Sequence, residues 1–308
     1  FINRQDGRMR GTIEEGVWME MNEIRKLRVE AGWIWKISPR STVAWYEVEK
    51  SYGVYPSGVS ETGVKSSYAG HIRSEGVGLL GLSWSPAKNV QFQFWEQYAE
   101  NVFNTALFRS DWKVPVSPDV HLISGLMVVR QDALNDGGNP DPAKAYIRKG
   151  SRAQVFSGRA GAGIRKFEFT FNYTRILDDG RFLMPREWGR EPFYTFMPRE
   201  RNEGFADVHA VNVSAGASLL NGRLKPSLSY GHFYLPDVKD AKRNKYGMPA
   251  YRQLNAEVRY AFSGYLKGMA LQFLMVYKGE MGETYGEYRY VFNKVNMLNW
   301  NVMVDYKF

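Results

Sequence analysis

The stretch Leu298-Asn-Trp-Asn-Val-Met-Val-Asp-Tyr-Lys-Phe308 decides the fold class of this chain. Every second side chain from Leu298 to Phe308 is apolar or aromatic, and most of those between are polar. Successive side chains of a β-strand point to opposite faces, so this period of two predicts a strand with one apolar face. That face is aromatic near both ends, which is typical of lipid-facing barrel strands. A half-buried strand of a soluble sandwich would also alternate, so the stretch alone leaves both classes open.

The composition excludes a helical membrane protein but agrees with a β-barrel. Among the 308 residues, whose mean hydropathy is −0.43, no stretch approaches the ~18 apolar residues of a helical span. Aromatic residues make up 15% of the chain, which suits membrane-interface belts. The absence of Cys excludes disulfides, thiolate catalysis and Cys zinc sites. The net charge of +9 fits a basic surface, nucleic-acid binding or, in a barrel, a pore wall that favours anions.

Period-two alternation recurs along the whole chain and predicts about thirteen strands. The facing of residues 120–131 is ambiguous, and 155–164 is rich in Gly. We expect strands at residues 13–21, 27–37, 76–85, 90–97, 106–114, 120–131, 155–164, 167–173, 211–219, 224–234, 254–262, 271–277 and 298–308.

The connections between these strands alternate in length. Short turns are expected at 22–26, 86–89, 115–119, 164–166, 221–222 and 263–268. The other connections are long except at 101–104, and they cover 38–74, 132–149, 178–208, 236–250 and 281–293. Pro115 is expected to turn the chain because proline is excluded from central ladders, and Asn221-Gly222 matches a type I′ hairpin. Short periplasmic turns and long extracellular loops characterise up-and-down outer-membrane barrels. A sandwich or propeller has no reason to alternate short and long connections in this way.

We therefore expect residues 1–308 to form a single all-β domain, the C-terminal portion of a transmembrane up-and-down antiparallel β-barrel. Bacterial single-chain barrels use even numbers of strands, and an open edge would leave backbone groups that lipid cannot satisfy. The chain opens at Phe1 without a charged-apolar-small signal segment, and we expect further strands upstream.

Five stretches resemble a known family. They are Met184 to Gly204, the opening Phe1 to Arg10, Arg40-Ser-Thr-Val-Ala-Trp-Tyr46 with Gly53-Val-Tyr-Pro-Ser-Gly58, and Glu100-Asn-Val-Phe-Asn-Thr-Ala-Leu107. They look like segments of the OprD-type substrate-specific outer-membrane porins. The resemblance implies a monomeric barrel of eighteen strands, of which these would be the last thirteen. It also implies an outer-membrane location in a Gram-negative bacterium.

By the same resemblance, two extracellular loops fold into the lumen, and they correspond to the region ending near Arg10 and to about 178–208. The basic and aromatic residues there are the candidates for the constriction: Arg4, Arg8, Arg10, Arg186, Arg190, Tyr194, Arg199 and Arg201. The arginines of 178–208 alternate with glutamates, so a loop held by its own salt bridges is the alternative. Phe308 resembles the terminal signal that such barrels present to their insertion machinery.

The polar strand faces carry charges that would line a lumen. The basic candidates are Arg28, Lys36, Arg109, Lys113, Arg159, Lys225 and Arg259. The acidic candidates are Glu20, Glu30, Asp111, Glu168 and Glu257. They are either ordinary water-facing side chains or, as in the family, a cationic ladder that guides carboxylates and focuses the field along the pore.

The predicted function is facilitated diffusion of small hydrophilic solutes, such as amino acids, organic acids, short peptides or oligosaccharides carrying a carboxylate. A structural subunit of a larger outer-membrane complex and a barrel enzyme are the alternatives. The four His show no metal-ligand spacing and no nucleophile elbow is present, so we expect no catalytic site, metal or cofactor. The expected partners are outer-membrane lipid, lipopolysaccharide, anionic or zwitterionic solutes, the insertion machinery and other outer-membrane subunits, with no nucleic acid.

Overall fold

The computed structural model describes residues 10–199 and 201–307, and in that part of the chain one antiparallel sheet contains every long strand. The strands pair in chain order from β1 to β14, except that the two-residue β3 pairs only with β2. Their bounds are β1 Ile13–Met21, β2 Leu27–Ser38, β3 Tyr46–Glu47, β4 Val77–Ala87, β5 Val90–Ala99, β6 Phe103–Ser117, β7 Val120–Ala133, β8 Arg152–Ile164, β9 Phe167–Ile176, β10 Val208–Ala217, β11 Leu224–Tyr234, β12 Tyr251–Ala261, β13 Met269–Glu280 and β14 Met297–Tyr306.

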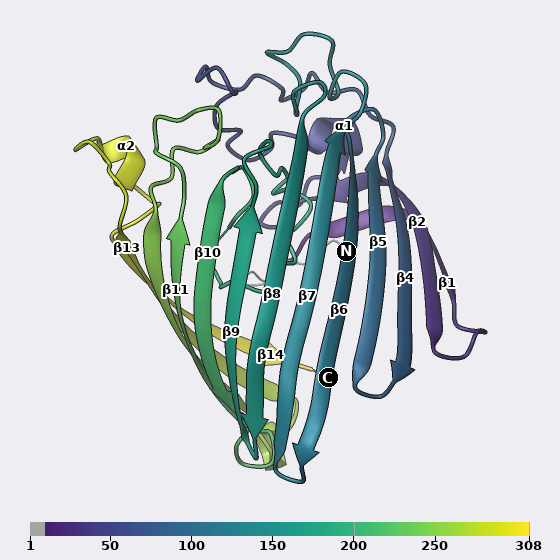
Figure 1. Cartoon of the computed structure of the whole chain (residues 1–308), viewed down its shortest axis with the longest axis vertical. Helices are drawn as coiled ribbons and strands as arrows, with labels where there is room; N and C mark the ends of the chain where they lie inside the picture. Colours follow the sequence, from purple (N-terminus) through teal and green to yellow (C-terminus); the bar gives the residue numbers. More distant parts are fainter. Residues whose placement is uncertain (1–9, 200, 308) are drawn as a thin grey trace.

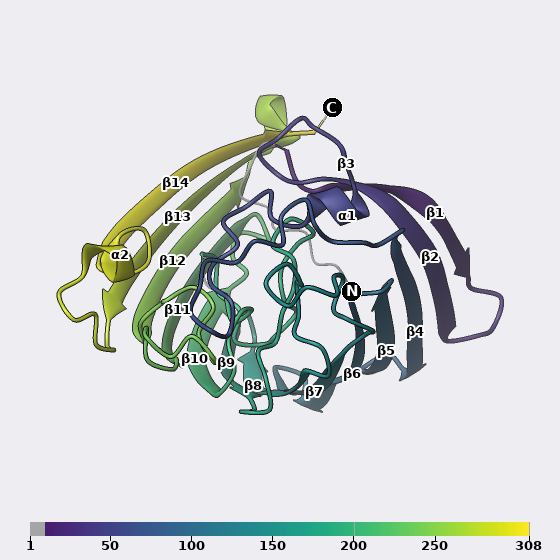
Figure 2. The same ribbon diagram turned by 90° about the horizontal axis from the view of Figure 1, so that it is seen from above.

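The sheet curls around the loops that join its strands. In Figure 1 the short turns lie together at one end and the long connections at the other. Seen from above, β1 and β14 form the two edges of the curl, and several loops lie within it (Figure 2). The helical segments are α1 (Val48–Ser51), α2 (Tyr288–Val291) and η1 (Gly264–Leu266). Among the described residues, no helix is long and apolar enough to cross a membrane.

The thirteen predicted strands are confirmed, each as one strand of this sheet, and three predictions about connections are wrong. The irregular stretch 38–74 contains β3 and α1, and 281–293 contains α2. Pro115 lies inside β6 opposite His121 and does not begin a turn. The register shifts between Pro115 and Ser117, and this irregularity accommodates the residue that cannot donate to the ladder.

The hairpin at Asn221-Gly222 is confirmed, but its loop is longer than two residues. Leu219 and Leu224 exchange backbone hydrogen bonds of 2.8 and 3.1 Å, so the loop comprises the residues between them. Leu220, Asn221 and Gly222 all have positive φ, from 50° to 82°. The left-handed conformation that the sequence predicts therefore occurs, spread over three residues.

The outer face of the sheet is apolar over most of its strands. In β14, Trp300 is 70% exposed and Val304 63%. Their neighbours across the ladder, Met275 and Leu271 of β13, share this outer face. A continuous exposed apolar surface of this kind marks contact with lipid or with a partner. The alternation that predicts the strands thus also assigns the side of the sheet that meets lipid or a partner.

The inner face is covered by loop residues, which form two apolar cores with it. One core gathers residues of β5 to β12 around Phe193, Tyr194 and Met197 of the connection 177–207. The other joins β2, β4 and β6 to α1 through Trp188 of the same connection. We call residues 177–207 the lumen loop, because they pack against the concave face of the curl.

Trp188 ties the lumen loop to α1. It is fully buried, lies 5.0 Å from the Tyr52 ring, and donates its indole N–H to Ser51 Oγ at 2.8 Å. We expect Trp188→Ala to lower the free energy of unfolding by about 3–5 kcal/mol, because it removes a large aromatic side chain from a packed core. Urea titration in detergent micelles measures this loss. Trp45→Ala, at a half-exposed position of the preceding loop, is the control and should cost below about 1 kcal/mol; equal losses would contradict the assignment.

Candidate functional site

Register places nearly all the predicted lumen charges on the inner face. Residues directly opposite in an antiparallel pair point to the same side of the sheet. Arg109 is opposite Met127, and Arg159 is opposite Gly125 and Asn172, all on the side of the lumen loop. By the same alternation this face also carries Arg28, Lys113, Lys225, Arg259, Glu20, Glu30, Asp111, Glu168 and Glu257.

Lys36 is the exception, and its predicted lumen position is wrong. The β1–β2 register shifts between Glu15 and Gly16, so that Glu15 is opposite Lys36 and Gly16 is opposite Ile34. The extra residue, Trp35, reverses the alternation for Lys36 and the rest of the strand. Lys36 therefore shares the outer face with Glu15, and their charged atoms lie 3.6 Å apart.

Lys278 is an inner-face cation that the sequence analysis missed. The predicted strand ends at Tyr277, but β13 continues to Glu280, and Lys278 is opposite Gln253 and Met297. It is only 3% exposed, and its ammonium lies 4.3 Å from the centre of the Tyr251 ring. Extending the predicted strand by one residue beyond Tyr277 would have placed Lys278 on the inner face.

The charge on this wall is mixed in sign. Acidic side chains are as frequent as basic ones on the inner face of the described strands, and several pairs are in contact. Arg28 Nη2 lies 2.7 Å from Glu20 and 2.8 Å from Glu30, and Arg109 Nε lies 2.5 Å from Asp111. The +9 charge of the chain is therefore not concentrated on this wall.

The lumen loop is held against the wall by buried polar groups. Asn212 donates to the Thr195 carbonyl oxygen at 2.8 Å, and the Thr195 hydroxyl lies 2.7 Å from that of Thr174. The Tyr194 amide donates to Ser157 Oγ at 3.1 Å. All of these side chains except that of Tyr194 are at most 2% exposed. Further along, Gln253 donates to the Pro198 carbonyl at 2.7 Å.

This anchoring places Tyr194 between two arginines of the wall. The Arg109 guanidinium lies 5.0 Å from the centre of the Tyr194 ring and that of Arg159 lies 4.7 Å away. The Tyr194 hydroxyl donates to Asp111 Oδ1 at 2.8 Å, and Arg159 Nε donates to Asn172 Oδ1 at 2.9 Å. Burial raises the pKa of the Tyr194 hydroxyl well above its usual range, so it remains a donor. We call Arg109, Asp111, Arg159 and Tyr194 the arginine–tyrosine cluster.

The other constriction candidates are dispersed. Arg186 Nε lies 2.7 Å from Glu203, which agrees with a loop held by its own salt bridges. Arg190 stacks 3.7 Å from the centre of the Phe196 ring, and Arg201 lies 3.5 Å from the Gly189 carbonyl. Arg199 reaches the wall and donates to Asn301 at 3.1 Å.

The candidates near the start of the chain contribute less to the site. Arg10 donates to the Thr42 carbonyl. Arg4, Arg8 and Phe308 lie outside the described residues.

Beyond the strands, four connections meet around Lys245. Its ammonium lies 4.9 Å from the Tyr68 ring centre, 4.7 Å from that of Tyr146 and 5.5 Å from that of Tyr246. The Tyr246 hydroxyl donates to Glu203 at 3.0 Å. Burial lowers the pKa of Lys245 to about 8, against the attraction of Glu203. This cluster connects the lumen loop to the loops on either side of it.

The family profile described as "outer membrane porin, OprD family" matches residues 1–199. The chain belongs to the OprD family. The family consists of outer-membrane porins, which are channels and not enzymes, and this places the chain in the outer membrane of Gram-negative bacteria. The resemblance seen in the sequence is thereby confirmed.

Solved structures of porins share the fold. Pseudomonas aeruginosa OpdQ superposes with a TM-score of 0.73 at 12% identity, over 99% of this chain and 73% of that one. Pseudomonas aeruginosa OccK8 (OprE) gives 0.74 at 13%, over 99% and 72%. Acinetobacter baumannii OccAB2 gives 0.72 at 12%, over 99% and 71%. At these identities the likeness shows the fold alone, and no curated protein matches the chain.

The lowered pKa of Lys245 predicts a pH dependence of stability. Between pH 8 and 10 the folded protein loses this proton, whereas the unfolded chain keeps it because its Lys pKa is 10.5. The unfolded state then binds more protons, so the free energy of unfolding should rise with pH, by up to about 1.4 kcal/mol per unit. Below pH 8 both states are protonated and the slope should vanish.

Urea titrations of the wild type and of Lys245→Met at pH 7, 8, 9 and 10 isolate this contribution as the difference between the two proteins. Lys242→Met, at an exposed position nearby, is the control and should keep the wild-type slope. A Lys245→Met protein with the wild-type slope would contradict the prediction.

Proposed function

We propose that this porin passes small hydrophilic solutes that carry a carboxylate, and that the arginine–tyrosine cluster is a step on their path. The solutes of this class are amino acids, organic acids, short peptides and acidic oligosaccharides. The observation that carries the proposal is the position of Arg109 and Arg159 on one wall, on either side of Tyr194. A guanidinium offers paired N–H donors that match the geometry of a carboxylate.

The pairing within the cluster leaves one positive charge in excess. Arg109 is bound by Asp111, whereas the hydrogen bond of Arg159 is made with the neutral side chain of Asn172. Arg159 is therefore the group that we propose meets the solute carboxylate. Asp111 offers an acceptor for the ammonium of a zwitterion, and a mixed wall of this kind suits amino acids better than simple anions.

We also propose that further strands join β14 to β1 and complete a barrel of eighteen. No ladder joins β1 to β14 in the described residues, and an open edge leaves backbone groups that lipid cannot satisfy. The insertion machinery, with Phe308 as its signal, and lipopolysaccharide are the partners that such a barrel would meet.

The packing inside the curl favours one alternative. Two apolar cores form between the loops and the inner face, and such filling suits a closed barrel that acts as a subunit of an envelope complex. Planar-bilayer recording separates the two functions. Stepwise open-channel currents that an added amino acid or small organic acid reduces support the porin, and a protein that inserts without steps supports the subunit.

Charge changes in the cluster should alter ion selectivity in opposite directions. One unit charge at ~6 Å in water is worth about 0.7 kcal/mol, with opposite sign for an anion and a cation, so Arg159→Gln and Arg109→Gln should each lower the anion-to-cation permeability ratio about tenfold. Asp111→Asn should raise the ratio by a similar factor. Reversal potentials in a salt gradient measure these ratios.

The matched control is Arg165→Gln, which removes an arginine from a short turn outside the lumen, where it pairs with Asp119 at 3.3 Å. Its permeability ratio should equal that of the wild type. If all four variants keep the wild-type ratio, the cluster does not lie on the ion path.

A further inference from the structure

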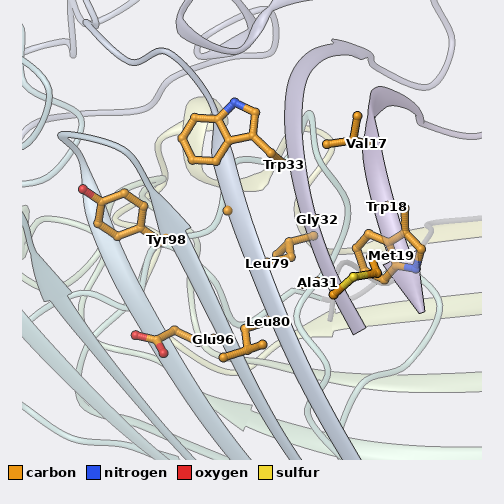
Figure 3. Close-up of a pocket in the computed structure, with 11 residues that line it drawn as sticks. Val17, Trp18, Met19, Ala31, Gly32, Trp33, Leu79, Leu80, Glu96 and Tyr98 are labelled. Atoms are coloured by element: carbon orange, nitrogen blue, oxygen red, sulfur yellow. The ribbon is translucent and has the colours of Figure 1, made fainter. Parts of the chain in front are cut away.

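An apolar groove lies on the outer face of β1, β2, β4 and β5. Its volume is about 520 Å³, and nearly all of its lining is apolar (Figure 3). Two cross-strand rows form its walls and floor. They are Val17, Trp33, Gly78 and Tyr98 in one row, and Met19, Ala31, Leu80 and Glu96 in the next. The remaining lining residues are Trp18, Gly32 and Leu79, which alternate with these along β1, β2 and β4.

Two small residues account for the groove. Gly78 lies between Trp33 and Tyr98 in its row, and Ala31 lies between Met19 and Leu80 in the other. Large side chains therefore flank a shallow floor that runs diagonally across the strands. A flexible hydrocarbon chain fits such a trough, because it gains contacts with the ring faces on both sides.

A charged cluster continues the same outer face on β7 and β8. Asp132 accepts from Arg130 Nε at 2.7 Å and Nη2 at 3.2 Å, and from Arg152 Nε at 3.0 Å. Both arginine side chains are 54% exposed. Each guanidinium has five N–H donors, and these bonds use two from Arg130 and one from Arg152. One carboxylate thus balances only one of the two positive charges.

The register connects the groove to this cluster. Tyr98, at one wall of the groove, is opposite Asn104, which is opposite Asp132, which is opposite Arg152. Adjacent strands lie ~4.8 Å apart, so Gly78 and Asp132 are about 15 Å apart across the sheet. A single glycolipid with several acyl chains can span both.

We propose that this face binds one phosphorylated glycolipid of the outer leaflet, with a phosphate on Arg130 and Arg152 and an acyl chain in the groove. The charged cluster lies at the end of the strands that faces the outer leaflet. Arg152 begins β8 directly after the long connection 134–151, and long connections are extracellular in such barrels. Phosphate and guanidinium groups form strong paired hydrogen bonds.

The carboxylate of Glu96 sets the orientation of the lipid. Glu96 lies in the row of Leu80 and accepts from Asn104 at 2.8 Å. Its charge excludes a phosphate from the groove itself, so the phosphate must lie over the arginines. Glu96 can accept from the hydroxyl and amide donors of a glycolipid. The proposal does not depend on which solute the pore passes.

The test is native mass spectrometry of the delipidated porin in detergent, titrated with three probes: bis-phosphorylated lipid A, lipid A with both phosphates removed, and phosphatidylglycerol. We expect a one-to-one complex with bis-phosphorylated lipid A, at least about tenfold tighter than with the other two. The double variant Arg130→Gln/Arg152→Gln should lose this preference about tenfold.

Gly78→Leu tests the groove independently. A Cβ at Gly78 would lie 3.5 Å from the Trp33 ring and 3.7 Å from Tyr98 Cβ, so the backbone accepts the new side chain, which then fills the trough. This variant should weaken binding of all acylated probes. Arg165→Gln, at the opposite end of the barrel, should bind as the wild type does. Far-UV circular dichroism of each variant in detergent confirms that the barrel has folded.

Three results would overturn the proposal. They are equal binding of the three probes, wild-type affinity in the Arg130→Gln/Arg152→Gln variant, and a dimer of the porin that Gly78→Leu disrupts. The last would assign the face to a second copy of the chain.

Discussion

The structure depends on a buried polar seam between the lumen loop and the wall. Thr195 meets Thr174 and Asn212, and the hydroxyl of Thr174 lies 2.8 Å from that of Ser157. A buried hydroxyl or amide without a partner costs more free energy than a hydrogen bond gains, so each side of the seam needs the other. The inner face of β8 to β10 therefore requires this loop, and the loop requires this face.

The seam also explains how one loop serves both packing and transport. The apolar residues of the lumen loop pack into the two apolar cores. Its backbone carbonyls accept hydrogen bonds from side-chain amides of the wall, such as that of Gln253, and such amides are also compatible with a water-filled lumen. Tyr194 follows Phe193 and precedes Thr195, so anchoring those neighbours fixes the ring between Arg109 and Arg159. The geometry of the arginine–tyrosine cluster is thus a consequence of the anchoring, and it does not rest on the cations themselves.

Much of the fold could be predicted from the sequence because side-chain alternation reports directly on which face meets lipid. The same rule assigns the inner position of Arg109 and Arg159. It fails at Lys36, where one extra residue in β2 reverses the faces without any signal in composition. It could not show that Tyr194 meets those arginines, since this contact joins a loop to strands distant in sequence. The pattern of basic residues also does not show which of them form ion pairs. The contacts of Arg28 with Glu20 and Glu30, and of Arg109 with Asp111, are visible only in the structure.

The most direct measurement of the central claim is disulfide formation in a Thr174→Cys/Thr195→Cys variant. The two hydroxyls lie 2.7 Å apart, within the reach of a disulfide, and the chain has no other Cys to compete. If the lumen loop is seated as described, mild oxidation in the folded state should give a single cross-link between residues 174 and 195, detected by peptide mass spectrometry, while unfolding beforehand should abolish its selectivity. Free thiols after oxidation of the folded protein would show that the loop does not rest on this wall, and the arginine–tyrosine cluster would lose its basis.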